Sequence, residues 1–367
     1  MNYIVATDGG LYCYYHKDGG IWFCEFVGGV WSNIRELIPG AHRDFTVNLI
    51  DDDKPLLIWR DSDGGLKKGR FSGKDIDAKV LIAGKGEFGE YRAIPAEDGL
   101  NLVYTLPFSG DMHMLMLQPV GANGAWGAVG RVDNISAMAD GLFRLVPIAN
   151  KHFLAIYQSS GFESKLGYKE IYGDNIGKYN LIHSSIHSFG DCSFLATKYD
   201  LHIACVVRGV FGSRLVYKKK GADGLSPGVV VAEGQGLHNI VLYMVDEKLY
   251  LLFMKNDTLY CVEAESDGYR WNFLPLEEHE KMQSGNLAKA VFLSSRSGRG
   301  FLANELLVHS ERPWEISTLS RHLLVDYKQN IQAQVAEAPE KPPKNHDDFF
   351  DNMEAELGEF LKSAPRQ

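Results

Sequence analysis

The segment FRLVPIANKHFLAIYQ (143–158) consists of two apolar runs joined by a polar turn at 150–151. Branched and aromatic residues are frequent in both runs, and a short apolar run that ends in a polar turn is typical of a β-strand. The same arrangement recurs along the first 320 residues, where helical periodicity is nearly absent. The other pairs of runs are NYIVAT (2–7) with LYCYY (11–15), DFTVNLI (44–50) with PLLIWR (55–60), YRAIPA (91–96) with LNLVYT (100–105), SFLATKY (193–199) with LHIACVV (201–207), NIVLYMV (239–245) with KLYLLFM (248–254), and AKAVFLS (288–294) with GFLANELL (300–307).

The pairs recur at a regular interval. The step is about 45 to 50 residues, which is the usual length of a four-stranded propeller blade. Two more strand-like runs follow a pair, for example RLVYKKKGADG (214–224) and PGVVVAEG (227–234). The repeat therefore resembles the β-propeller superfamily, with no specific family assigned. The resemblance implies an all-β fold: a seven-bladed β-propeller of four-stranded blades over residues 1–325, in which the first run of each pair lines a central channel.

Charge and composition narrow the classes of function. The formal net charge is −9, which argues against nucleic acid as a partner because phosphate backbones attract basic surfaces. No stretch is apolar enough for a membrane span, and the start MNYIVATDGG does not resemble a secretion signal. The five cysteines contain no C-x-x-C pair, so we expect buried, reduced thiols. We predict a cytoplasmic protein without a metal or another cofactor.

The end of the chain differs from the repeat. Residues 326–345 read as a helical segment and a Pro- and charge-rich linker, and residues 346–367 read as an amphipathic helix. Apolar residues form one stripe on an acidic background in that helix. An isolated helix of this length is marginal in water, so we expect it to dock on a partner, on a second copy or on its own propeller. The residues of the stripe are Phe349, Phe350, Met353, Leu357, Phe360 and Leu361.

Arginines recur at matching positions of the predicted innermost strands. Arg92 and Arg144 each precede a proline by three residues, and Arg43 comes just before the innermost strand of an earlier unit. Guanidinium groups that converge at one mouth of the channel would bind a carboxylate or a phosphate through forked hydrogen bonds. The alternative is local pairing, of Arg92 with Glu90 or Asp98 and of Arg144 with Asp140, or pairing of each arginine with backbone carbonyls of the channel.

These patterns leave more than one function open. The sequence favours a non-catalytic interaction or scaffold protein that binds a protein partner or itself through the C-terminal helix. The alternative is a propeller that binds a carbohydrate or a small anion, as a lectin does, with the three arginines as its ligand-binding residues. A carbohydrate-acting enzyme is less favoured, because the spacing places no nucleophile–base pair and no catalytic residue.

Overall fold

The computed structural model describes residues 2–314 apart from 8–9, 28–29, 52–53, 72–75, 84–87, 140, 150, 160, 266–267, 269, 275–285 and 295–300. The chain divides into two compact units, Met1–Ser320 and Arg321–Gln367, and the described residues all belong to the first. Among them, no helix is long and apolar enough to cross a membrane.

Antiparallel four-stranded sheets follow one another along the chain, and six such blades are formed by the described strands. Blade I contains β1 (Asn2–Thr7), β2 (Gly10–Lys17), β3 (Gly20–Val27) and β4 (Val30–Pro39); blade II contains β5 (Ala41–Asp51), β6 (Lys54–Asp61), β7 (Leu66–Phe71) and β8 (Ile76–Ile82); blade III contains β9 (Tyr91–Pro95), β10 (Leu100–Ser109), β11 (Met112–Val120) and β12 (Gly130–Ser136). Blade IV contains β13 (Phe143–Ala149), β14 (His152–Ser159), β15 (Ser164–Tyr172) and β17 (Asn180–Ser185), with the short β16 (Asn175–Ile176); blade V contains β18 (Phe189–Ala196), β19 (Leu201–Arg208), β20 (Ser213–Gly221) and β22 (Val229–Gly234), with the short β21 (Gly224–Leu225); blade VI contains β23 (His238–Val245), β24 (Lys248–Lys255), β25 (Thr258–Ala264) and β26 (Trp271–Leu274).

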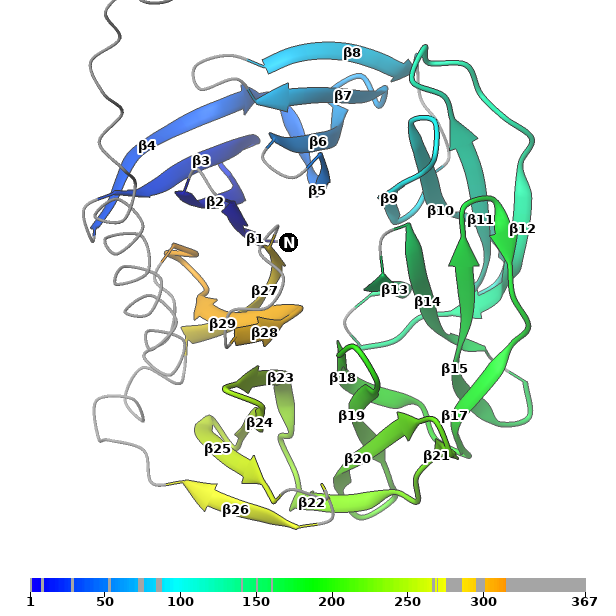
Figure 1. Ribbon diagram of the computed structural model, residues 1–367, viewed down its shortest axis with the longest axis vertical. Helices are drawn as coiled ribbons and strands as arrows, with labels where there is room; N and C mark the ends of the chain where they lie inside the picture. Colours follow the sequence, from blue (N-terminus) through cyan, green and yellow to red (C-terminus); the bar gives the residue numbers. More distant parts are fainter. Residues whose placement is uncertain are drawn as a thin grey trace, which may run out of the picture. The chain divides into compact units, whose positions relative to one another are not determined.

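The first strand of each blade lies innermost, and the blades surround a common centre, which makes the unit an all-β propeller (Figure 1). Hydrogen bonds join the starts of successive innermost strands. The Tyr91 hydroxyl of β9 donates to the Asp44 carbonyl of β5, and the Leu142 amide next to β13 donates to Glu90 Oε2 next to β9 at 2.6 Å. The innermost strands therefore begin on one face of the ring, named here the start face, and end on the opposite face, the end face.

The core of the unit lies between blades. Separate clusters of buried apolar side chains fill the gaps I/II, II/III, III/IV, IV/V and V/VI. In the first of these, the Tyr3 and Phe45 rings lie 5.2 Å apart and the Tyr3 hydroxyl donates to the Phe45 carbonyl. Because each sheet buries its faces against its neighbours, each blade depends on the adjacent blades for its core. All five cysteines are buried and unbridged, as the sequence predicts.

The predicted seventh blade is not confirmed. Its expected strands become β27 (Leu287–Ser294), β28 (Phe301–Ala303) and β29 (Glu305–His309), and none of them begins a new four-stranded sheet among the described residues. Instead, β27 pairs in parallel with β1 and antiparallel with β29, whereas β28 pairs with β23 of blade VI. The inner edge of β1 offers unpaired backbone groups, and pairing with β27 satisfies them while joining the two ends of the ring.

The C-terminal segment stays a prediction. The linker of residues 326–345 and the helix of residues 346–367 lie outside the described residues. The same holds for the apolar stripe from Phe349 to Leu361 that the sequence assigns to partner docking.

Candidate binding site in the central channel

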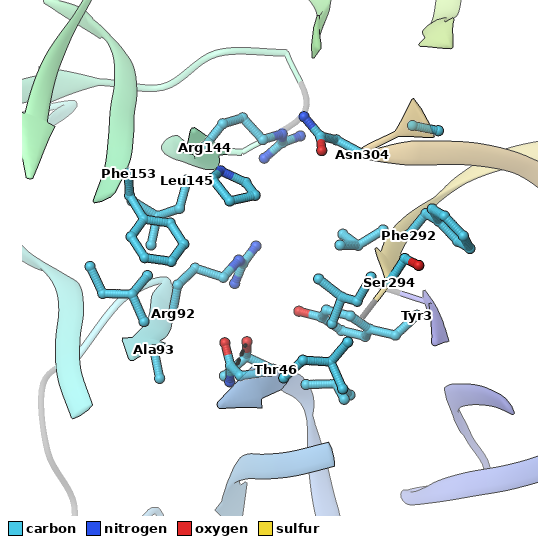
Figure 2. Close-up of a pocket in the computed structure, with 18 of the residues that line it drawn as sticks. Tyr3, Thr46, Arg92, Ala93, Arg144, Leu145, Phe153, Phe292, Ser294 and Asn304 are labelled. Carbon is cyan, nitrogen blue, oxygen red and sulfur yellow. Dashed lines mark hydrogen bonds between the residues drawn. The ribbon is translucent and has the colours of Figure 1, made fainter. Parts of the chain in front are cut away.

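A cavity of about 360 Å³ lies inside the ring, among the innermost strands and the closing strands β27 and β28. Figure 2 shows side chains from both groups of strands around it. Its polar lining includes Thr46 and Asn48 of β5, Ser294 and Asn304, and its aromatic lining includes Tyr3, Phe153, Phe292 and Phe301. Two charged side chains, Arg92 and Arg144, line it, and no carboxylate is among its described lining residues.

Arg92 and Arg144 occupy the second positions of β9 and β13, which are neighbouring innermost strands. Both guanidinium groups point into the cavity (Figure 2). Their side chains are only 17% and 15% exposed, so water screens their charges weakly. Both arginines of the sequence prediction thus line one cavity, and their role in binding a ligand stays a prediction.

Local contacts fix the guanidinium of Arg92. Its Nη2 donates to Glu90 Oε1 at 2.5 Å, and its Nη1 donates to the Tyr91 carbonyl at 2.7 Å. The group also lies 6.0 Å from the centre of the Phe143 ring, within the range of a cation–π contact. The alternative of local pairing is therefore correct for Arg92 and Glu90. This pairing orients the guanidinium while leaving it in the wall of the cavity.

Arg144 contacts both a neighbouring carbonyl and a distant carboxylate. Its Nη1 donates to the Phe143 carbonyl at 3.2 Å, and its Nε lies 3.9 Å from Glu305 Oε1 on β29. Asp140, the local partner considered from the sequence, lies outside the described residues.

Glu305 is the centre of a buried charged cluster. Its Oε1 lies 3.3 Å from Lys289 Nζ, and its Oε2 accepts a hydrogen bond from Ser193 Oγ at 2.9 Å. Lys289 Nζ in turn lies 2.6 Å from Asp191 Oδ1, while Asp191 Oδ2 accepts from the Ile240 amide at 2.8 Å. The cluster thus joins blade V to blade VI and to the closing strands, and it holds the carboxylate that faces Arg144.

Arg43 does not line this cavity. Its side chain is 80% exposed and lies 4.0 Å from Asp44. It lines a second pocket, also of about 360 Å³, together with Asp44, Glu90 and Arg92 at the start face. The structure therefore brings Arg92 and Arg144 together and places Arg43 in an adjoining pocket that shares Arg92.

Sequence reasoning missed Glu305, Lys289 and Asp191. Each is a charged residue inside an apolar strand-like run, in ANELL (303–307), LAKAVF (287–292) and GDCSF (190–194). Charged residues are rarely buried unless they are paired, so a charge in such a run was the available signal. The tryptophans Trp31, Trp126 and Trp271 do not line the cavity.

Comparisons with known proteins identify only the fold. No protein-family model matches the chain, and no curated protein matches it in sequence. Among solved structures, a polysaccharide lyase, the PL25 ulvan lyase, matches with a TM-score of 0.50 and 9% identity over 84% of this chain and 91% of the lyase. A six-bladed fungal lectin from Aleuria aurantia matches with a TM-score of 0.41 and 11% identity over 75% of this chain and 93% of the lectin. The lectin SapL1 matches with a TM-score of 0.43 and 11% identity over 74% of this chain and 94% of SapL1. At 9% identity the match to the lyase concerns the architecture alone. By the arrangement of its own sheets, this chain is a β-propeller.

Proposed function

We propose that the propeller binds a small acidic ligand of the carbohydrate class in its central cavity. One observation carries the proposal: Arg92 and Arg144, from matching positions of adjacent innermost strands, are the charged side chains of the described lining. Their carboxylate partners, Glu90 and Glu305, are not among those lining residues. The cavity wall therefore presents positive charge, which favours an anion.

The rest of the lining suits the body of a sugar. Phe153, Phe292 and Phe301 offer apolar faces against which a sugar ring can pack, and Asn48 and Asn304 carry amide groups of the kind that bind hydroxyls. Ligand pockets usually measure about 300–1,000 Å³, and this one lies at the small end of that range. A monosaccharide with a carboxylate fits that size and that charge.

The choice of a first probe follows from these features. The PL25 ulvan lyase is bound to a saccharide that contains glucuronate. D-glucuronate combines a sugar ring with one carboxylate, and D-glucose is its neutral counterpart. L-fucose is a second neutral probe, because the Aleuria aurantia lectin is described with a fucose recognition mode.

Titration calorimetry with the full chain tests the proposal. We expect D-glucuronate to bind and both neutral sugars to bind at least about tenfold more weakly. The neutral sugars lack the carboxylate that would accept the forked, charge-assisted hydrogen bonds of an arginine. Arg144→Lys keeps the charge but removes the fork, so affinity for glucuronate should fall about tenfold. Arg214→Lys is the matched control, because it makes the same substitution at an arginine that is 66% exposed and belongs to an outer ion pair. Equal affinities for the three sugars, no binding, or no effect of Arg144→Lys would contradict the proposal.

The protein-interaction function that the sequence favoured first remains a separate prediction. It depends on the helix of residues 346–367, which lies outside the described residues. Deletion of residues 336–367 should change the oligomeric state or the set of co-purifying proteins. Light scattering and mass spectrometry of the purified protein would measure both, and no change in either would contradict this function.

A further inference from the structure

The hairpins between the second and third strands of the blades lie on one face of the ring. Strands alternate in direction within a blade, so these hairpins lie on the face where the innermost strands begin, the start face. The turns between first and second strands lie on the end face for the same reason. The six hairpins can therefore be compared as one surface.

Three successive blades carry a phenylalanine at this hairpin. Phe108 in blade III, Phe162 in blade IV and Phe211 in blade V are 51%, 101% and 98% exposed. Two exposed aliphatic side chains accompany them: Val210, next to Phe211 in the chain, is 75% exposed, and Ile186, in the same blade as Phe162, is 73% exposed. Exposed aromatic side chains on three neighbouring blades form a repeated feature of the surface rather than scattered apolar residues.

Cationic side chains accompany the three phenylalanines. The Arg131 guanidinium lies 5.8 Å from the centre of the Phe108 ring. Lys165 follows Phe162, and Arg208 and Arg214 flank Phe211, all three being exposed. Acidic groups are also present: Asp111 lies in the first hairpin, Glu163 accepts from Ser184 in the second, and Glu233 pairs with Arg214 beside the third.

The other half of the start face has a different character. The corresponding hairpins of blades I, II and VI carry the exposed Asp18, Asp63 and Asp257 at their tips. In blade I, Lys17 lies 3.8 Å from Asp18 and 5.7 Å from the centre of the Trp22 ring. The face is thus divided into a half with exposed phenylalanines at its tips (blades III–V) and a half with polar tips (blades VI, I and II). Such a division favours an oriented contact through one half only.

We propose that the hairpin tips of blades III–V dock this protein on a lipid surface. The three phenylalanines lie on separate hairpins of one face. They therefore form three separate contact points, which suit a flat surface, and not one continuous groove, which would suit a peptide. Aromatic rings insert at the boundary between headgroups and acyl chains, and the adjacent Arg and Lys side chains contact lipid phosphates. The polar half of the face would point away from the membrane.

Vesicle co-sedimentation of the full chain tests this inference. The probe is a vesicle of phosphatidylcholine with phosphatidylglycerol, at low salt. The variants Phe108→Ser, Phe162→Ser and Phe211→Ser each remove one exposed ring, and the triple variant removes all three. Each loss should weaken binding roughly tenfold, because burial of a Phe side chain carries about that factor. Because Phe162 and Phe211 are exposed, replacing them leaves the packed core unchanged.

A matched control lies on the end face. Tyr199 is 77% exposed in the turn between β18 and β19, and Lys198 Nζ lies 5.1 Å from the centre of its ring. Tyr199→Ser therefore removes an exposed aromatic with an adjacent cation and should leave vesicle binding unchanged. No sedimentation of the wild type would overturn the inference and leave the tips as a contact for a protein. Equal sedimentation of the wild type and the triple variant, or an equal loss in Tyr199→Ser, would overturn it as well.

Discussion

His202 lies in the core between blades V and VI, where its charge state is linked to folding. Its Nδ1 lies 2.8 Å from the Tyr217 hydroxyl. Burial lowers the pKa of His202 from 6.5 to about 4, while Asp200 raises this pKa and Lys219 lowers it by smaller amounts. The folded state therefore binds the proton less tightly than the unfolded state. This contribution to stability is complete above pH 6.5 and is lost as the pH falls toward 4.

We predict an acid-sensitive fold whose sensitivity depends on this histidine. A shift of this size corresponds to about 3 kcal/mol of free energy of unfolding. His202→Gln keeps a hydrogen-bonding group but cannot be protonated, so its melting temperature should fall less between pH 7 and pH 4.5. Tyr217→Phe should keep the wild-type pH dependence, since burial and not the hydroxyl is the main cause. Parallel pH profiles for the wild type and His202→Gln would contradict this.

Glu305 supports a second prediction at the residue scale. It is buried and faces both Lys289 and Arg144, so Glu305→Gln leaves two buried cations without their shared carboxylate. Removing one partner of a buried ion pair costs about 3 kcal/mol, which urea unfolding would measure. Glu233→Gln is the control, because its pair with Arg214 is exposed and should contribute less than about 1 kcal/mol. Similar losses in the two variants would argue against a structural role of the cluster.

The charged cluster shows which single residues of the site the sequence can predict and which it cannot. Arg92 and Arg144 were predictable because they occupy the same position of a local repeat. Glu305 was not, because its contact with Ser193 joins residues 112 apart in the chain. Periodicity places a residue on a strand, whereas its partner across the channel depends on how the ring closes.

At the scale of elements, strands β27 and β29 show that the sequence predicts a strand but not the strand with which it pairs. The apolar run AKAVFLS predicts a strand correctly, because strand formation depends on local pattern. Its pairing with β1 depends instead on which sheet edge is open after six blades have formed. A repeat of about 45 to 50 residues therefore predicted the blades well and the closure of the ring poorly.

The closing strands lead to a prediction about truncation. Residues Asn2 to Ala6 of β1 pair with Ala290 to Ser294 of β27, and β29 supplies Glu305 to the charged cluster. A chain ending at residue 286 loses both, which exposes the edge of β1 and removes the contact between Arg144 and Glu305. We expect this chain to lose its cooperative unfolding transition, as followed by circular dichroism.

A longer truncation is the control for this experiment. A chain ending at residue 320 removes the second compact unit and retains the first. It should unfold cooperatively, with a midpoint close to that of the full chain. If the chain ending at residue 286 unfolds with that same midpoint, the closing strands do not hold the ring together.

At the scale of the molecule, the central cavity is lined by residues from both ends of the first compact unit. Tyr3 comes from β1, Arg92 and Arg144 come from the middle of the chain, and Phe292 comes from β27. A ligand bound there would contact strands that the ring must bring together, and it would be released when they separate. Ligand binding and ring closure are therefore thermodynamically linked.

This linkage gives a prediction that rests on the proposed function. At a concentration about 100 times its Kd, D-glucuronate should stabilise the ring by about 2.7 kcal/mol, which raises the melting temperature of the whole unit in one transition. Hydrogen exchange should slow in β1, β9, β13 and β27 together, because all four line the cavity. Arg144→Lys should reduce both effects, and D-glucose should produce neither. An equal rise with D-glucose, or protection confined to one blade, would mean that the ligand does not act through the arginine-lined cavity.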